Sequence, residues 1–293
     1  MEFMAKAITK AVFPVAGLGT RFLPASKVLP KEMLPIIDKP LIQYAIDEAL
    51  EAGISDIMMV TGRGKNILED HFDHAPELEK VLRDRNKTEE LQAVLNFPKV
   101  SALSYTRQQQ PLGLGHAIWC ARKFVGDEPF AVLLPDDLIQ ASPGCLKQMI
   151  EVYKEVGGNI VATSAVPNKD TEKYGILSIE SDDGKLVRAN GIIEKPSPDE
   201  APSNLSVIGR YILQPSIFKY LQLEIKGAGG EIQLTDAIKA VMSDVTLHGF
   251  RYDGVRFDCG SKKDFICANV AFALARDDLR NDVHDALSKL IKF

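Results

Sequence analysis

A strand, a helix and a second strand follow one another at short intervals near the start of the sequence, and this order restricts the fold more than any other feature. Residues 11–16 are a short apolar run of strand length. Residues 40–53 carry apolar side chains at helical spacing, with a proline at the first turn and a glycine at the end. Residues 56–61 are a second apolar run. Short links between such elements require a right-handed crossover, so the sequence predicts neighbouring parallel strands.

The alternation of strands and helices continues to residue 166 and then changes. Further apolar strands are predicted at 102–107, 130–134 and 159–166. Beyond Lys173, two strand-like segments flank Asp182-Asp183-Gly184, which is a turn signal between antiparallel strands. We therefore predict an α/β fold with a Rossmann-like, mixed but mainly parallel central sheet flanked by helices. A small antiparallel excursion and C-terminal helices complete the prediction.

Composition excludes several classes of protein. The 293 residues are 45% hydrophobic and 26% charged, as in a soluble globular protein with a sizeable core. The net charge of −5 gives no general attraction to nucleic acid or to an anionic membrane. No apolar run has membrane-spanning length, the first residues lack the apolar core of a secretory signal, and the four cysteines form no CxxC pair. We expect a cytoplasmic protein without nucleic-acid or membrane partners.

A glycine turn, Gly17-Leu18-Gly19-Thr20-Arg21, follows the first strand. Glycines let the backbone approach a ligand closely, and the N–H groups of such a turn form an anion-binding concavity. Arg21, Lys27 and Lys31 add three cations. The dinucleotide fingerprint fails because Phe22 stands where its third glycine is needed, and no P-loop string occurs. The segment predicts a polyphosphate site, although the turn alone would also suit an ordinary strand-to-helix connection.

Polar residues follow two later strands where each ends. Gln108 precedes a second glycine loop at Gly113, and its amide could read a pyrimidine edge, although a surface glutamine before a helix fits equally. Asp136 and Asp137 follow the strand at 130–134. Paired carboxylates beside phosphates suit Mg²⁺, whereas a turn or a helix cap would also use them.

Two further candidates lie late in the chain. Lys195 ends the antiparallel segment within Glu194-Lys195-Pro196, where a strand-end salt bridge is the simpler reading, and Asp258 follows another apolar run. Nucleotidyl transfer to a sugar phosphate needs little covalent chemistry from the protein, because positioning and charge stabilisation dominate. A second aspartate for the metal and a separate cation for the sugar phosphate would complete such a site.

Several motifs together resemble those of the sugar-nucleotide pyrophosphorylases, also called nucleotidyl-1-phosphate transferases. The matching segments span nearly the whole chain and are GLGTR, LPKEMLP, RQQQPLGLGHA, LLPDD, KYG, IIEKP, GEIQLTDAI and FDCGS. RNKTEEL, RFLPASK and LLPDDL are similar to the bacterial uridylyltransferase branch. The resemblance implies transfer of UMP from UTP to glucose 1-phosphate, giving UDP-glucose and pyrophosphate, on a nucleotide-diphospho-sugar transferase fold.

The resemblance also implies a role for each candidate residue. The nucleotide would be bound by Ala16, Gly17, Gly19, Thr20, Gln108 and Gly113. The sugar phosphate would be bound by Gly175, Glu194, Lys195 and Val207. The catalytic cations would be Arg21, Lys31 and Lys195, and Mg²⁺ would be held by Asp136 and Asp258. Lys27 and Asp137 carry no firm role, and Asp137 would serve only to orient Asp136.

Two alternatives stay open. A thymidylyltransferase is one, because discrimination by a single methyl group is worth only about 1–3 kcal/mol. A catalytically inactive nucleotide-sugar-binding regulator is the other, although both aspartates and Lys195 are present. We expect one nucleotidyltransferase domain over 1–293, with 8–166 mainly binding nucleotide and 167–260 mainly binding sugar phosphate. The helices of 261–293 would support a homodimer or homotetramer.

Overall fold

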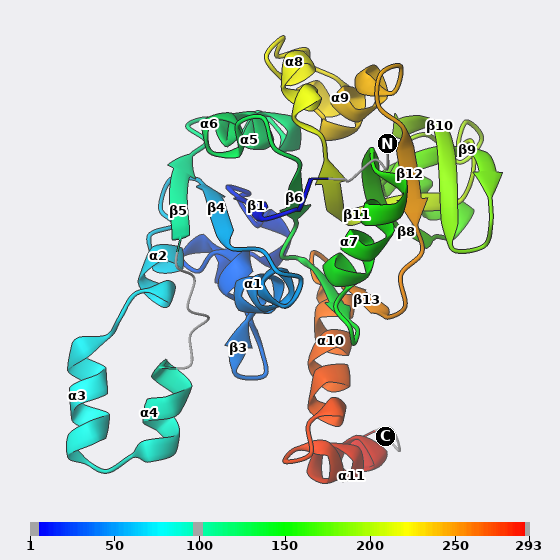
Figure 1. Cartoon of the computed structure of the whole chain (residues 1–293). Coiled ribbons are helices and arrows are strands. Elements are labelled where there is room, and N and C mark those ends of the chain that lie inside the picture. The colour runs from blue at the N-terminus through cyan, green and yellow to red at the C-terminus, as the bar shows by residue number, and fades with distance from the viewer. Residues whose placement is uncertain (1–5, 96–101, 291–293) are drawn as a thin grey trace.

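The central sheet is the framework of the molecule (Figure 1). A computed structural model describes residues 6–95 and 102–290. The strands of the sheet are β1 (Lys10–Val15), β4 (Asp56–Thr61), β5 (Ala102–Arg107), β6 (Phe130–Leu133), β8 (Asn159–Ala165), β9 (Gly175–Asp182), β10 (Leu186–Glu194), β11 (Leu205–Leu213) and β12 (Leu247–Phe250). Their order across the sheet is β5-β4-β1-β6-β11-β8-β12-β10-β9.

The first half of the sheet is parallel, as predicted. β1 pairs in parallel with both β4 and β6, and β4 pairs in parallel with β5. Val15 lies opposite Thr61, and Thr61 lies opposite Arg107, so these strands end at nearly the same level. The glycine turn, Gln108 and Asp136 therefore start from one edge of the sheet, where open α/β sheets bind ligands.

The antiparallel part is larger than the predicted small excursion. β9 and β10 form the expected hairpin around Asp182-Asp183-Gly184. β11 also runs antiparallel to β6 and to β8, so antiparallel pairing reaches the middle of the sheet. Every residue of β11 is buried. A strand that is buried on both faces lacks the alternation of apolar and polar residues that marks a half-exposed antiparallel strand, so its sequence does not reveal its direction. The predicted α/β fold class is confirmed.

Helices cover both faces of the sheet, because alternate residues of a strand point to opposite faces. Val12 packs in one apolar cluster, with α5 (Leu114–Cys120), α6 (Arg122–Val125), α8 (Phe218–Leu221) and α9 (Leu234–Val241). Phe13 packs in the other cluster, with α1 (Leu41–Glu51), α2 (Ile67–Phe72) and α7 (Cys145–Val156). Figure 1 shows the two helical layers on either side of the strands.

Shorter elements complete the chain. Two small sheets pair β7 (Asp137–Gln140) with β13 (Val255–Asp258) and β2 (Pro35–Ile36) with β3 (Lys39–Pro40). The 3-10 helices are η1 (Thr20–Phe22), η2 (Ala25–Lys27), η3 (Lys31–Met33), η4 (Asn168–Lys173), η5 (Pro215–Ile217) and η6 (Ala228–Gly230). Asp258 lies opposite Asp137 across β13 and β7, which brings the end of β13 to the site.

Two helical pairs extend from the body (Figure 1). α3 (Pro76–Asp84) and α4 (Thr88–Leu95) form a hairpin. α10 (Lys262–Ala275) begins at Ser261, whose hydroxyl accepts a hydrogen bond from the Asp264 N–H, and α11 (Arg280–Leu290) packs at its far end.

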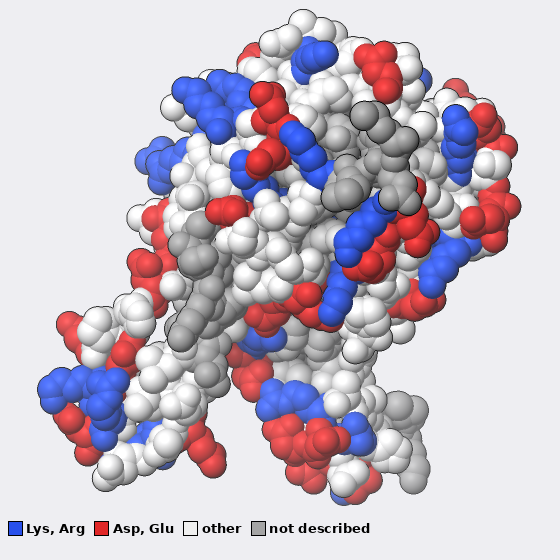
Figure 2. Space-filling view, viewed as in Figure 1, with Lys and Arg blue, Asp and Glu red and all other residues white. Residues whose placement is uncertain are grey.

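The surface mixes charges of both signs. On the face in Figure 2, lysines and arginines lie between aspartates and glutamates rather than in one broad patch. Within residues 6–95 and 102–290, none of the helices has both the length and the apolar character needed to span a membrane.

Candidate active site

Two adjoining cavities at the carboxyl edge of the parallel strands contain every predicted site residue. The first is lined by Ala16, Gly17, Gly19, Thr20, Lys31, Gln108 and Gly113. The second is lined by Arg21, Gly175, Glu194, Lys195, Val207 and Asp258. The residues that line both are Leu114, Leu134, Asp136 and Glu231. We call them the nucleotide-side and sugar-side cavities. Lys27 lies outside both, in a neighbouring hollow beside Arg63.

The glycine turn is shaped by its own loop. Gly19 has φ 65°, a left-handed conformation that favours glycine. The Ser26 hydroxyl donates a hydrogen bond of 2.6 Å to the Gly19 carbonyl and fixes the turn. A Cβ at Gly17 would lie 3.6 Å from Cε of Lys31, so the lysine side chain passes directly over the turn. Backbone N–H groups and an ammonium group therefore face the same cavity.

Lys31 and Asp136 form an ion pair between the two motifs. Nζ of Lys31 lies 2.5 Å from Oδ2 of Asp136. Burial opposes the charge on Lys31, but Asp136 and Glu32 outweigh it, and the pKa of Lys31 is raised. Burial likewise opposes ionisation of Asp136, but Lys31 and Arg21 outweigh it, and the pKa of Asp136 is lowered. Both groups are therefore charged at neutral pH.

A second ion pair, which sequence analysis missed, holds the segment that carries Lys31. Nζ of Lys65 lies 2.7 Å from Oε2 of Glu32, and the two side chains are only 9% and 1% exposed. Burial raises the pKa of Glu32 and lowers the pKa of Lys65, while each partner's charge opposes the shift of the other. The pair joins η3 to the loop after β4. No spacing rule links residues 33 positions apart, so nothing in the sequence marked it.

Asp136 and Asp258 face one small space beside Gly260. A Cβ at Gly260 would lie 2.8 Å from Oδ1 of Asp258, 3.1 Å from Nη1 of Arg21 and 3.5 Å from Oδ2 of Asp136. The missing side chain leaves room there for an ion between two carboxylates, which are ligands that Mg²⁺ prefers. In the described part of the chain, no group of three or more histidine, cysteine or acidic side chains has metal-binding geometry. A cation at this place would take its other ligands from phosphate and water.

Asp137 supports the site rather than facing the cation space. Its Oδ2 accepts a hydrogen bond of 2.8 Å from the Gly209 N–H, and its Oδ1 accepts one of 2.6 Å from Nε of Arg256. Burial raises the pKa of Asp137, against the opposing charge of Arg256. The carboxyl group thus joins β7, β11 and β13. The hydrogen bonds and the ion pair described for Asp137 are with Gly209 and Arg256 and not with Asp136. Direct orientation of Asp136 by Asp137 therefore stays a prediction.

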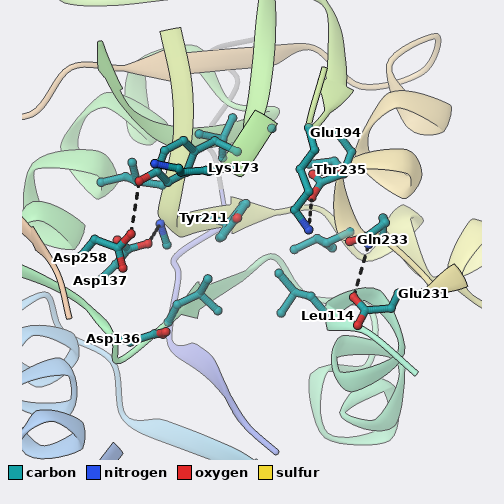
Figure 3. A pocket seen from close by; sticks show the side chains of 18 of the residues that line it. Leu114, Asp136, Asp137, Lys173, Glu194, Tyr211, Glu231, Gln233, Thr235 and Asp258 are labelled. Carbon is teal, nitrogen blue, oxygen red and sulfur yellow. Dashed lines mark hydrogen bonds and ion pairs between the residues drawn. The ribbon is translucent and has the colours of Figure 1, made fainter. Parts of the chain in front are cut away.

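Glu194 lies across the sugar-side cavity from the aspartates (Figure 3), and Lys195 lines the same cavity. Oε2 of Glu194 accepts a hydrogen bond of 2.8 Å from the Thr235 hydroxyl, and its Oε1 lies 3.4 Å from Nζ of Lys195. A Cβ at Gly175 would lie 2.8 Å from Cγ2 of Thr235, so only glycine leaves that wall open. Figure 3 shows Glu194 and Thr235 on one side, with Asp137 and Asp258 on the other.

The Gln108 amide and the second glycine loop hold one another. Nε2 of Gln108 donates a hydrogen bond of 2.9 Å to the Gly113 carbonyl and lies 3.1 Å from Nδ1 of His116. Gly113 has φ 106°, and a Cβ there would lie 2.8 Å from the Ile232 carbonyl oxygen. The amide nitrogen is thus committed to the loop, and Oε1 is the atom that can accept a hydrogen bond from a base.

Sequence analysis also missed three side chains of the sugar-side cavity: Tyr174, Thr235 and Arg256. One of them had a usable signal. Arg256 stands two residues before Asp258 in a strand, and residues two apart in a strand share a face. Tyr174 and Thr235 lie within KYG and GEIQLTDAI, where only the family resemblance drew attention to them.

A glycine turn, two carboxylates and a separate cation meet at one edge of the sheet. This arrangement is typical of nucleotide-transferring α/β proteins. Comparison with known proteins agrees, since the nucleotidyl transferase family matches residues 10–273. The chain belongs to the nucleotidyl transferase family, and the predicted family resemblance is confirmed.

Individual relatives show which members of this family the chain is similar to in sequence and structure. UTP–glucose-1-phosphate uridylyltransferases from Bacillus subtilis (strain 168) and Komagataeibacter xylinus are 48% and 53% identical over 278 and 263 residues. The alignments cover 95% and 88% of this chain, and 95% and 92% of the relatives. A UDP-glucose pyrophosphorylase complexed with UDP-glucose has a TM-score of 0.83 at 43% identity, covering 92% of this chain and all of that one. UTP-bound UGPase from Acinetobacter baumannii has a TM-score of 0.89 at 41% identity, covering 97% and 99%.

Proposed function

We propose that the chain transfers UMP from UTP to α-D-glucose 1-phosphate, giving UDP-glucose and pyrophosphate. The observation that carries the proposal is the pair of adjoining cavities that share Asp136. One has the glycine turn and Lys31, and the other has Lys195 and Glu194. The names of the relatives support a uridylyltransferase over a thymidylyltransferase and over an inactive regulator.

The nucleotide-side cavity suits UTP. The turn residues Gly17, Gly19 and Thr20 would offer backbone N–H groups to the phosphates, and Lys31 would offer a cation from the same cavity. Arg21 lines the adjoining sugar-side cavity and would offer a second cation to the phosphates from there. Oε1 of Gln108 can accept a hydrogen bond from N3–H of uracil, next to the close-packed loop at Gly113. Ala16 lies where the strand ends and would contact the ribose.

The sugar-side cavity suits glucose 1-phosphate. Lys195 would bind its phosphate as a charge-assisted partner, and the Glu194 carboxylate would accept hydrogen bonds from sugar hydroxyls. Gly175 and Val207 leave the wall open and apolar for the ring. Residues 8–166 would thus serve mainly the nucleotide, and 167–260 mainly the sugar phosphate.

The chemical step is a displacement at phosphorus. An oxygen of the sugar phosphate attacks the α-phosphorus of UTP as the bond to the bridging oxygen breaks, and the electron pair leaves with pyrophosphate. The attacking phosphate is already ionised, so the residues need only align the groups and stabilise charge. Asp136 and Asp258 would hold Mg²⁺, which when bound neutralises phosphate charge.

We also propose a cytoplasmic homodimer or homotetramer joined through residues 261–293. α10 supports this, because it is apolar around much of its circumference and several of its apolar side chains are only half-buried or exposed. Only Ala268 and Ala273 are buried in it, and Ile266 is 63% exposed. Helices that are apolar on all sides are normally buried.

Pyrophosphate release tests the activity. We expect release with glucose 1-phosphate and UTP that depends on Mg²⁺ and falls strongly when dTTP replaces UTP. Equal or better use of dTTP would place the chain among the thymidylyltransferases. No release with any nucleoside triphosphate, despite UTP binding, would favour the inactive regulator.

A further inference from the structure

Tyr174 connects the two halves of the sugar-side cavity. Its hydroxyl donates a hydrogen bond of 3.2 Å to Oδ2 of Asp258. Its backbone carbonyl accepts a hydrogen bond of 2.9 Å from the Lys195 N–H. Lys195 itself has φ 48°, an uncommon conformation for a residue with a side chain. One residue therefore contacts a proposed cation ligand through its side chain and a proposed sugar-phosphate ligand through its backbone.

Asp258 is held at both of its oxygens. Oδ1 accepts a hydrogen bond of 3.0 Å from the Gly260 N–H, while Oδ2 accepts the one from Tyr174. A carboxylate oxygen has more than one lone pair, so each can accept this bond and still face a cation. The two hydrogen bonds fix the rotation of the carboxylate that faces Asp136 across Gly260.

A competing partner stands close by. Nη2 of Arg256 lies 4.0 Å from Oδ2 of Asp258, at the limit of an ion pair. The Arg256 guanidinium is instead bound to Asp137 and lies over the ring of Tyr174, 5.0 Å from its centroid. A small rotation of the Asp258 carboxylate would complete a salt bridge to Arg256 and turn its oxygens away from Asp136.

We propose that the Tyr174 hydroxyl is a positioning group that keeps Asp258 turned toward Asp136 and away from Arg256, so that the cation site is formed before the cation binds. The inference rests on the proposed assignment of Asp258 as a cation ligand. Partners that orient a metal ligand commonly change metal affinity about 10–100-fold when removed.

Tyr174→Phe tests this role, because it removes the oxygen atom that bonds to Asp258, together with its interaction with Arg256, and keeps the ring over Arg256. It also keeps the backbone carbonyl that binds the Lys195 N–H. We therefore expect a weaker cation site with an unchanged sugar-phosphate site. A merely structural role for Tyr174 would instead loosen both, since the same residue supports both.

The experiment measures Mn²⁺ binding by electron paramagnetic resonance, with a UTP analogue that carries a methylene group between its α- and β-phosphates. We expect Tyr174→Phe to raise the Mn²⁺ dissociation constant about tenfold. At saturating cation, the KM for glucose 1-phosphate should stay within about twofold of wild type. Tyr44→Phe is the matched control, because it also removes a hydroxyl that donates a hydrogen bond, in this case to the Ile36 carbonyl.

Asp258→Asn separates failure of the inference from failure of the proposed cation site. If Asp258→Asn weakens Mn²⁺ binding and Tyr174→Phe leaves it at the wild-type value, the positioning role is wrong and the cation assignment stands. If Asp258→Asn itself binds Mn²⁺ as wild type does, the assignment and the inference both fall. A rise in the KM for glucose 1-phosphate that equals the change in Mn²⁺ affinity would also overturn the inference.

Discussion

At the scale of single residues, several side chains of the site are held by neighbouring residues through hydrogen bonds and ion pairs. Glu32 and Lys65 support Lys31, Thr235 supports Glu194, and Gly209 supports Asp137 through its N–H group. Such partners lock the geometry that transfer between two bound phosphates requires, since small misplacements are costly in rate.

Lys195→Ala should separate binding of the sugar phosphate from binding of the nucleotide. The variant loses a charge-assisted hydrogen bond, which is worth about 1.5–3 kcal/mol, and the KM for glucose 1-phosphate should rise roughly 10–100-fold. The KM for UTP should change little, because Lys195 lines only the sugar-side cavity. Steady-state kinetics with each substrate varied in turn measure both constants.

Two further variants bracket that result. Asp136→Asn should abolish turnover, because Asp136 lines both cavities and pairs with Lys31. Lys154→Ala, on the exposed side of α7, should behave as wild type. A Lys195→Ala enzyme whose UTP constant shifts as much as its sugar-phosphate constant would contradict the assignment.

The residues of the site could be predicted to different extents. The glycine turn and Asp136 follow apolar strands and carry strong local patterns, so the sequence identified them. Sequence analysis did not identify Arg256 and Lys65 as residues of the site. Their partners are 119 and 33 positions away in the sequence, and only tertiary contacts bring each pair together. Motif resemblance recovered Asp258 and Lys195, whose local patterns alone fit simpler explanations.

At the scale of elements, α10 is unusual because its apolar residues surround the helix and only Ala268 and Ala273 among them are fully buried. Its cap at Ser261 explains why it begins where the sequence predicted. The short strands β7 and β13 escaped prediction because four residues are too few to show a period. Their pairing nevertheless places Asp258 opposite Asp137.

Ile266→Glu should reduce the oligomeric state of the chain. We expect wild type to sediment as two or four chains and the variant to sediment as a smaller species, because a charge in an apolar interface is costly to bury. Ile225→Glu is the matched control, since Ile225 is 69% exposed in a loop away from α10. Analytical ultracentrifugation decides the matter, and a monomeric wild type would refute the proposed interface.

At the scale of the whole molecule, Arg210 links the sheet to α1 and α7 on one of its faces and to the site. Its guanidinium binds Glu48 of α1 through Nη2 at 2.8 Å, and Nη1 donates a hydrogen bond of 3.0 Å to the Leu134 carbonyl. Glu48 in turn accepts a hydrogen bond of 3.0 Å from the Leu146 N–H at the start of α7. Leu134 stands two residues before Asp136, so this buried network also holds the loop that carries Asp136.

Arg210→Met should destabilise the fold strongly. It leaves Glu48 without its charged partner, and removing one member of a buried ion pair typically costs about 3–5 kcal/mol. The double variant Arg210→Met with Glu48→Leu should lose clearly less free energy of unfolding than the single variant. Urea denaturation measures these free energies.

An exposed ion pair provides the control. Lys80→Ala breaks the pair between Lys80 and Asp84 on α3, whose side chains are 72% and 60% exposed. Its free energy of unfolding should change by less than about 1 kcal/mol. An Arg210→Met effect no larger than this would show that Arg210 does not support the fold.

The overall topology was only partly predictable. Parallel pairing of β1 and β4 followed from the helix between them, because short links leave one handedness. The antiparallel direction of β11 did not follow, because Leu205–Leu213 is buried on both faces and its sequence does not state a direction. Its direction is set by neighbours that lie far away in sequence.

The residues that the two cavities share, Asp136 among them, have a consequence for dissociation of the product. UDP-glucose joins a nucleotide to a sugar, so it would cover Asp136 from both sides and occupy both cavities at once. A ligand that binds at two adjoining sites dissociates more slowly than a ligand at either site alone. When one end is released, the other end keeps it at a high effective concentration, and it rebinds. The same closeness that brings the two reactants into line therefore favours slow departure of the product, which excludes either substrate while it stays.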